Sequence, residues 1–200
     1  MEFAMKMDCA RKKLMGMLDG SRYLHSLGVS ETASRLAVKY GADPDKASLA
    51  GLVHDCAKSL SGGQLLKEAF DANIEVDYVD RAQPGLLHGP VGAVIARREF
   101  AIDDDEILDS IRYHTTGRED MTLLDKIIYI ADYIEPGRNF PGVEELRTES
   151  AKDLDRGIMM AMDGTIEFVL ERKMMLDLKT VRARNFMLRC ETSAKEKPNE

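Results

Sequence analysis

The chain has 200 residues, of which 44% are hydrophobic and 32% are charged. This composition is typical of a globular domain and excludes collagen-like, mucin-like and low-complexity proteins. Lys and Arg number 28 against 35 for Asp and Glu, which gives a formal net charge of −7. Because no run of five like charges occurs either, a general nucleic-acid-binding surface is disfavoured, and we expect no nucleic-acid partner.

The three cysteines, Cys9, Cys56 and Cys190, lie far apart and form no CxxC pair. An odd number of scattered cysteines indicates a reducing compartment. No apolar run approaches the roughly 20 residues that span a membrane, and charged residues interrupt the Met-rich start, unlike the apolar core of a signal peptide. We therefore expect a cytoplasmic protein with a mature N-terminus and no membrane partner.

Apolar residues recur at spacings of three and four through most of the chain, which predicts an all-α fold. Ser21 precedes a predicted helix over 22–40 that ends at Gly41, and Asp43-Pro44 begins the next helix. Further helices are predicted at about 62–72, 85–99, 104–114, 121–134, 143–151, 152–174 and 180–190.

We expect one domain over residues 1–191, because the prolines and glycines between 136 and 142 are spaced as in a turn rather than a linker. Apolar periodicity is lost from residue 192, so the segment 192–200 is expected to be a disordered tail. The twelve methionines suit gap-filling in the core. Alternatively, the methionines clustered at 159–162 and 174–175 could line a homodimer interface.

The four histidines of the sequence are His25, His54, His88 and His114, and all fall at apolar positions of predicted helices. A lone histidine in such a position is more often a core residue whose ring bonds a carbonyl. Four together, each beside other functional groups, favour a functional site.

His54 and Asp55 are adjacent in a small, apolar segment predicted to be helical through Lys58. A carboxylate in such surroundings is costly unless it is paired or metal-bound, and imidazole and carboxylate both bind divalent metals. Lys58 would share the helix face of Asp55. It then either holds a phosphate beside a metal or forms an ion pair with Asp55.

Asp132 lies within the predicted helix 121–134, which is apolar almost all round, so it should be paired, protonated or metal-bound. Arg22 and His25 are three residues apart and can face one site. Six candidate ligands exceed the needs of one metal ion with an open position, whereas two ions bridged by a carboxylate fit the number. The candidates are His25, His54, Asp55, His88, His114 and Asp132.

The candidate ligands belong to longer motifs: Arg22-x-x-His25, Gly51-Leu-Val-His-Asp-Cys-Ala-Lys58, Leu87-His-Gly-Pro-Val-Gly-Ala93, Tyr113-His-Thr-Thr-Gly117, Ile130-Ala-Asp-Tyr-Ile-Glu-Pro-Gly-Arg138 and Ala183-Arg-Asn185. Their order resembles the HD-domain metal-dependent phosphohydrolase superfamily. From about Arg22 to Asn185 the chain is similar to the bacterial YqeK-type family of symmetrical dinucleoside tetraphosphate hydrolases.

This resemblance implies an HD-domain helical bundle with a metal site in its core. It implies one ion held by His25, His54, Asp55 and Asp132, and a second held by Asp55, His88 and His114. The two divalent ions would be iron first, with manganese or another divalent ion as alternatives. The implied reaction splits diadenosine tetraphosphate into two ADP molecules with a metal-activated bridging water.

In this interpretation the catalytic residues are Asp55, which bridges the ions, and Lys58. The expected substrate-binding residues are Arg22, Lys58, Thr115, Arg138, Leu176 and Thr180. The stretch Met175–Thr180 departs from the family, which commonly carries a proline there.

Two other functions share these residues. The same metal core could hydrolyse another nucleotide, such as a mononucleotide, guanosine tetraphosphate or a cyclic dinucleotide, since the fold alone does not decide the substrate. A non-catalytic nucleotide-sensing module is the third interpretation, and the full set of six ligands argues against it. No GxSxG, GxxxxGK[ST], GxGxxG or HExxH motif indicates a rival chemistry.

Overall fold

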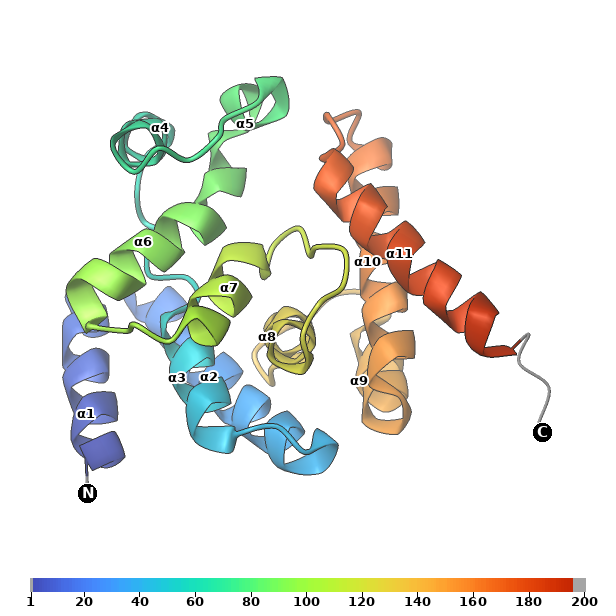
Figure 1. Cartoon of the computed structure of the whole chain (residues 1–200), viewed down its shortest axis with the longest axis horizontal. Coiled ribbons are helices and arrows are strands. Elements are labelled where there is room, and N and C mark those ends of the chain that lie inside the picture. Colours follow the sequence, from blue (N-terminus) through green and yellow to red (C-terminus); the bar gives the residue numbers. More distant parts are fainter. Residues whose placement is uncertain (1, 196–200) are drawn as a thin grey trace.

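A computed structural model describes residues 2–195, in which every regular element is a helix. The predicted all-α class is therefore confirmed (Figure 1). The α-helices are α1 (Glu2–Met15), α2 (Gly20–Tyr40), α3 (Pro44–Val53), α4 (Gly62–Asp71), α5 (Tyr78–Ala82), α6 (His88–Phe100), α7 (Asp105–Tyr113), α8 (Leu123–Ile134), α9 (Val143–Lys152), α10 (Leu154–Glu171) and α11 (Leu178–Lys195), and a short 3-10 helix, η1 (Pro84–Leu87), precedes α6.

Helix α8 is the central element of the fold (Figure 1). It packs against α2, α3 and α7 on one side and against α9 and α10 on the other. Ile127, Ile128 and Ile130 are fully buried, as is the side chain of Tyr129. A helix that is apolar on every side must be covered on every side, so residues carried by α8 lie inside the protein.

The ends of the helices follow local capping chemistry. Helix α2 begins after Asp19, whose side chain accepts a hydrogen bond from the Arg22 amide, and not after Ser21 as predicted. The carboxylate of Asp19 also accepts the hydroxyl of Ser21 at 2.8 Å, so Ser21 supports the cap instead of forming it. Gly41 ends the helix as predicted, with a φ of 81° that favours glycine.

Helix α3 ends earlier than the sequence predicts. Its last residue is Val53, His54 is the C-cap, and residues 54–59 form successive turns. The Lys58 amide donates to the Asp55 carbonyl over three residues at 2.9 Å, a turn rather than an α-helical bond. The prediction of a helix through Lys58 is therefore wrong, but the turn keeps the two residues near each other.

Two helices were not predicted. Helix α1 buries Met7, Ala10 and Leu14, a spacing of three and four that its many charges conceal. Helix α5 has only five residues and begins with a capping box between Asp77 and Asp80.

The C-terminal helix is longer than expected. Helix α11 continues to Lys195, so residues 192–195 of the expected tail are helical, and 196–200 lie outside the described residues. The methionine clusters divide: Met162 is fully buried, whereas Met174 and Met175 are exposed. Between residues 2 and 195, no helix is both long and apolar enough to cross a bilayer.

Candidate metal centre

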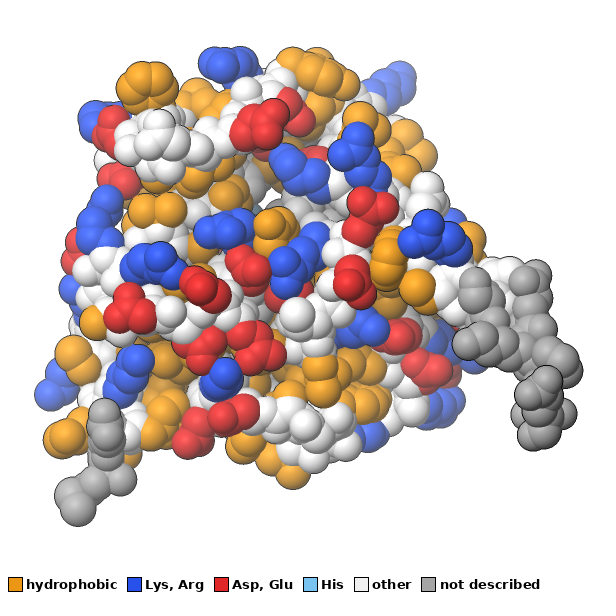
Figure 2. Space-filling view, viewed as in Figure 1, with side chains coloured by type: hydrophobic (Ala, Val, Ile, Leu, Met, Phe, Trp, Pro, Cys, Tyr) orange, Lys and Arg blue, Asp and Glu red, His pale blue; other side chains and the backbone are white. Residues whose placement is uncertain are grey.

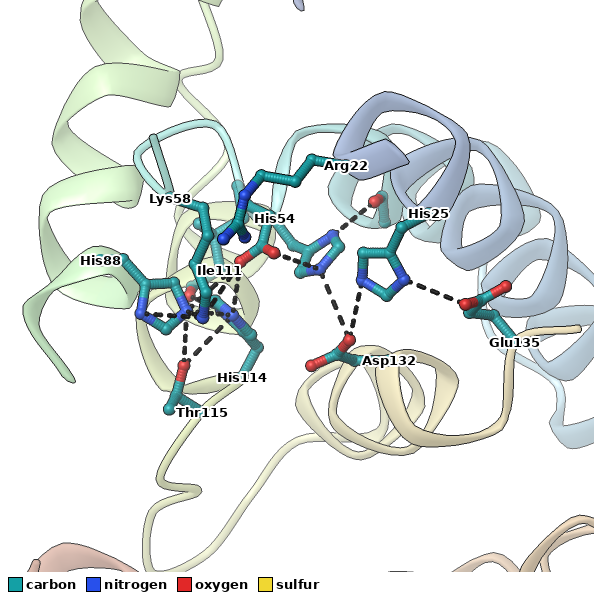
Figure 3. A network of polar contacts seen from close by, with 12 residues as sticks. Arg22, His25, His54, Lys58, His88, Ile111, His114, Thr115, Asp132 and Glu135 are labelled. Atoms are coloured by element: carbon teal, nitrogen blue, oxygen red, sulfur yellow. Dashed lines mark hydrogen bonds and ion pairs between the residues drawn. The ribbon is translucent and has the colours of Figure 1, made fainter. Parts of the chain in front are cut away.

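The four histidines, which lie between positions 25 and 114 of the sequence, meet in the core (Figure 3). His25 comes from the second turn of α2, His54 and His114 cap the C-terminal ends of α3 and α7, and His88 begins α6. Neighbouring ring centroids are 4.9 to 5.3 Å apart. Four helices therefore each supply one imidazole to a single cluster.

Three of the rings are oriented by their own backbone. In each, Nδ1 donates to the carbonyl oxygen three residues earlier; the pairs are His54 with Gly51, His88 with Gly85 and His114 with Ile111. This bond places the hydrogen on Nδ1, so Nε2 carries a lone pair. All three Nε2 atoms then face the interior of the cluster as acceptors or ligands.

The Nε2 atoms of His88 and His114 are 3.0 Å apart. Two lone pairs at this distance repel unless a hydrogen or a cation lies between them. Lys58 Nζ is 3.0 Å from His88 Nε2, and the Thr115 hydroxyl is 3.0 Å from the same atom and 3.2 Å from His114 Nε2. A cation and a hydroxyl donor thus contact the paired imidazoles.

Two carboxylates complete the cluster. Asp55 Oδ1 lies 3.3 Å from His88 Nε2 and 3.5 Å from His114 Nε2, and Asp55 Oδ2 lies 3.8 Å from His54 Nε2. Asp132 Oδ1 is 2.9 Å from His25 Nε2 and 3.8 Å from His54 Nε2. The structure therefore brings all six predicted ligands together, with Asp55 between the two ends of the cluster.

Several of these atoms lack a hydrogen-bond partner. His25 Nε2, His54 Nε2 and Asp55 Oδ1 are buried and unsatisfied, and the 2.9 Å approach of His25 Nε2 to Asp132 lacks hydrogen-bond geometry. A buried polar atom without a partner costs about 1–3 kcal/mol. Ligand atoms in three overlapping groups of three residues lie within 4.8 Å of one another. These side chains fit a divalent metal, which would satisfy the unpartnered atoms.

Burial sets the protonation of the imidazoles. It lowers the pKa of His54 to about 4, and it also lowers the pKa of His88. For His25, burial alone would lower the pKa, but the neighbouring carboxylates of Asp132 and Glu135 outweigh it and the pKa is raised. His54 and His88 are therefore neutral at pH 7, the form that binds metals.

The carboxylates are ionised despite their burial. Burial would raise the pKa of Asp55, but the proximity of the His54, His114 and His88 rings and of the Lys58 cation outweighs it and lowers the pKa well below its ordinary range. The pKa of Asp132 is likewise lowered, against its burial, by His25, His54 and Arg138. Imidazole nitrogens with two carboxylates form a mixed N/O set that suits iron, manganese and zinc better than calcium.

The predicted phosphate-binding residues lie around this cluster. Arg138 binds Asp132 directly, through its Nη2 to the carboxylate and its Nε to the backbone oxygen at 2.6 Å. Arg22 points toward the cluster (Figure 3), although its ion pair is with Asp19 at 3.5 Å. Lys58 lies 3.9 Å from Asp55 Oδ1, a longer contact than the one it makes with His88.

Leu176 and Thr180 are not placed at the cluster by any contact among the described residues. Their segment contacts α5 and Gln83, the residue between α5 and η1, instead. Gln83 Nε2 donates to the Met175 carbonyl at 2.7 Å, and Lys179 Nζ is 3.5 Å from Asp80 Oδ2.

The face shown in Figure 2 is hollowed near its middle, between the start of α6 and the α10–α11 pair, and Lys and Arg side chains lie at the rim. Elsewhere on this face basic and acidic side chains are interspersed. The positive charge available to an anionic ligand on this face is therefore local.

The sequence did not reveal Glu135. Its carboxylate accepts the Nδ1–H of His25 at 3.1 Å and is buried. One feature of the sequence could have indicated it. Glu135 is an acidic residue that directly follows the apolar helix α8 and precedes Pro136-Gly137, so a turn can direct its side chain into the core.

A protein-family model, the HD domain, matches residues 22–137. The chain belongs to the HD domain family. The match begins at Arg22, ends at Gly137 and contains all six residues of the cluster. The HD domain of this chain therefore comprises α2 to α8, while α9, α10 and α11 follow it.

Three curated relatives are each named symmetrical bis(5'-nucleosyl)-tetraphosphatase. The protein from Halalkalibacterium halodurans is 44% identical over 84% of this chain and 89% of its own. The Bacillus subtilis protein is 42% identical over 76% and 81%, and the Staphylococcus aureus protein is 38% identical over 91% and 94%. The similarity thus extends well beyond the HD domain.

A solved structure confirms the fold. It is described as a predicted HD superfamily hydrolase involved in NAD metabolism from Clostridium acetobutylicum, and it is 46% identical. It superimposes with a TM-score of 0.90 over 92% of this chain and 97% of its own. The helices that follow the HD domain therefore belong to an arrangement shared with this relative.

Proposed function

We propose that this protein is a symmetrical bis(5'-nucleosyl)-tetraphosphatase that hydrolyses diadenosine tetraphosphate to two ADP molecules. The observation that carries the proposal is the cluster of four imidazoles and two carboxylates, with unpartnered ligand atoms, in a chain 38–44% identical to three proteins of that name. Hydrolysis breaks the central P–O–P anhydride. The oxygen of water joins one of the two inner phosphorus atoms, and the second ADP leaves with the bridging oxygen.

Two divalent ions, iron first and manganese as the alternative, are proposed at the cluster. His25, His54, Asp55 and Asp132 would hold one ion, and Asp55, His88 and His114 the other. The 3.0 Å approach of His88 Nε2 to His114 Nε2 supports the second set. When bound, such ions lower the pKa of a water molecule and polarise a phosphoryl oxygen.

The side chains of this protein supply positioning and charge, which dominate phosphoryl transfer. Lys58 Nζ, within 3.0 Å of His88 and 3.9 Å of Asp55, is placed to contact an anion at the cluster, and the Thr115 hydroxyl is placed to donate to it. Arg138 and Arg22 would bind the flanking phosphates. Leu176 and Thr180 stay proposals for substrate contact, and so does a homodimer.

The reaction does not require a general acid, because the leaving group is a stable anion. ADP departs as a stable anion, especially when paired with a guanidinium such as that of Arg138. The buried carboxylates are ionised, so Asp55 and Asp132 act as ligands rather than proton donors.

The test is product chromatography. Chelator-stripped protein is incubated with diadenosine tetraphosphate, with and without Fe²⁺ or Mn²⁺, while bound metal is counted by mass spectrometry. We expect two ADP molecules only when metal is present, with about two ions bound at a dinuclear site. AMP plus ATP would contradict the symmetrical cleavage. No turnover by metal-loaded protein would favour another nucleotide substrate or a sensing module.

A further inference from the structure

We propose that Glu135 is a positioning residue, which orients His25 and strengthens it as a metal ligand. The inference rests on the proposed function, in which His25 binds a metal ion. It assigns a role to a residue outside the six predicted ligands.

His25 differs from the other three histidines in how its ring is held. The rings of His54, His88 and His114 bond a carbonyl only three residues away. His25 lies well inside α2, where backbone carbonyls bond the amides of the following turn. Its Nδ1 is held instead by Glu135 Oε1 at 3.1 Å, from a residue 110 positions later.

The carboxylate of Glu135 occupies a space shaped for it. Glu135 is only 4% exposed, and its Oε2 accepts the Gly137 amide at 2.6 Å. A Cβ at Gly28 would lie 2.5 Å from Oε2, and a Cβ at Gly137 would lie 3.0 Å from both carboxylate oxygens. Gly28, one turn after His25 in α2, and Gly137, after α8, therefore leave room for this carboxylate.

Arg147 of α9 fixes the segment that carries Glu135. Its guanidinium donates to three backbone oxygens, those of Ile134 at 3.0 Å, Glu135 at 2.7 Å and Arg138 at 2.9 Å. Arg147 lies beyond residue 137, where the HD match ends. A helix outside the HD domain thus holds the end of α8 in the position that Glu135 requires.

The chemical consequence follows from the direction of the bonds. When Nδ1–H donates to a carboxylate, Nε2 keeps its lone pair and gains electron density, and the ring cannot rotate away from Asp132. Loss of such an outer partner lowers metal affinity by about 10- to 100-fold. Because Glu135 contacts only His25 among the four rings, the loss should affect one ion more than the other.

The test is Mn²⁺ binding to chelator-stripped protein, measured by isothermal titration calorimetry. Glu135→Gln should weaken one binding event by about 10- to 100-fold and leave the other within about threefold. Gly28→Ala should have the same effect, because its Cβ displaces the carboxylate while alanine favours the helix. The control is Glu149→Gln, whose carboxylate on α9 contacts Lys152 and Arg156, and it should match the wild type.

Melting temperatures of the metal-free variants separate this role from a structural one. If Glu135→Gln melts earlier but binds Mn²⁺ as the wild type does, Glu135 is only structural and the inference is overturned. If the wild type takes up no Mn²⁺, the proposed metal site fails and the inference fails with it. If the wild type binds Mn²⁺, the variants bind it weakly and diadenosine tetraphosphate is not hydrolysed, the inference stands while the proposed function fails.

Discussion

Each histidine of the cluster has one ring nitrogen bound to an oxygen and the other directed inward. Burial lowers the pKa of His54 to about 4, so its ring is neutral at pH 7. Because Nδ1 donates to Gly51 O, the lone pair on Nε2 can bind a cation. The lowered pKa values of Asp55 and Asp132 keep both carboxylates ionised, and their negative charge favours a cation beside the neutral rings. The chemistry proposed for the cluster thus rests on its six side chains together with the oxygens that bond the outer ring nitrogens.

A substitution of Lys58 can distinguish whether its side chain binds phosphate or forms a structural ion pair with Asp55. Its Nζ is 3.9 Å from Asp55 and its side chain is 35% exposed, so the ion pair stabilises the fold little. Lys58→Met should keep the metal content and lower kcat for diadenosine tetraphosphate by roughly 100-fold, as loss of one charge-stabilising donor does. Lys67→Met, which removes an exposed lysine paired with Asp71, is the control. A lower melting temperature with unchanged specific activity would instead support the structural ion pair.

The buried thiol of Cys56 should make the free energy of unfolding depend on pH. Burial, followed by the charge of Asp55, raises its pKa from 9.0 to about 12, so the folded state holds the thiol proton more tightly. The contribution is therefore complete below pH 9 and is lost as pH rises toward 12. At pH 10 the loss is about 1.4 kcal/mol, because one pH unit corresponds to that energy.

The measurement is urea unfolding at pH 8 and pH 10 with a chelator present. Cys56→Ala should lose about 1.4 kcal/mol less than the wild type between the two pH values. Cys190→Ala, which removes an exposed thiol, should follow the wild type. Equal losses in all three proteins would show that the Cys56 thiol ionises freely.

The six proposed ligands could be picked out from the sequence because each is a side chain of a metal-binding type in an apolar stretch, and the structure brings them together. Glu135 could not, since its partner His25 is 110 residues away and only the packing of α8 against α2 joins them. Arg138 was predicted to bind phosphate, but the bond to Asp132 required the three-dimensional course of the chain after α8.

At the scale of elements, four of the six proposed ligands lie where helices begin or end: His54, Asp55, His88 and His114. The predicted helix through Lys58 failed because apolar composition continues past Val53 while the backbone turns. That early end is what frees Gly51 O to accept from His54 Nδ1. Composition predicts burial well, but the residue at which a buried helix stops depends on what packs against its end.

The crossing of α6 and α7 depends on Gly89. A Cβ at this position would lie 2.7 Å from the Arg112 carbonyl, so the backbones of the two helices approach closely beside His88 and His114. Gly89→Ala should lower the free energy of unfolding by about 1–3 kcal/mol through overpacking and weaken Mn²⁺ binding. Urea unfolding and calorimetric titration measure the two effects.

Gly164 provides the matched control for that substitution. It lies inside α10, and a Cβ added there would meet nothing within 4 Å. Gly164→Ala should therefore raise the free energy of unfolding by about 0.5–1 kcal/mol through helix propensity. If Gly89→Ala proved equally stabilising, the close contact between α6 and α7 would not be required.

At the scale of the molecule, the cluster joins parts of the chain that are distant in sequence. The side chains of the cluster come from α2, the end of α3, the start of α6, the end of α7, and α8, and α8 itself is surrounded by the core. The cations proposed there would together contact all of these segments. The unfolded chain does not hold them together, so metal binding must favour the folded state.

This linkage predicts a metal-dependent melting temperature. An ion at 100 times its Kd stabilises the folded state by about 2.7 kcal/mol, which raises the melting temperature of a chain this size by about 5–10 °C. Calorimetry of chelator-stripped protein with added Mn²⁺ measures the shift. Ca²⁺ at the same concentration should raise it less, since four of the six ligands are imidazoles and Ca²⁺ prefers oxygen. Asp55→Asn should show little response to Mn²⁺ because both ion positions lose a ligand, whereas equal shifts with Ca²⁺ and Mn²⁺ would indicate ions bound to surface carboxylates instead of the histidine cluster.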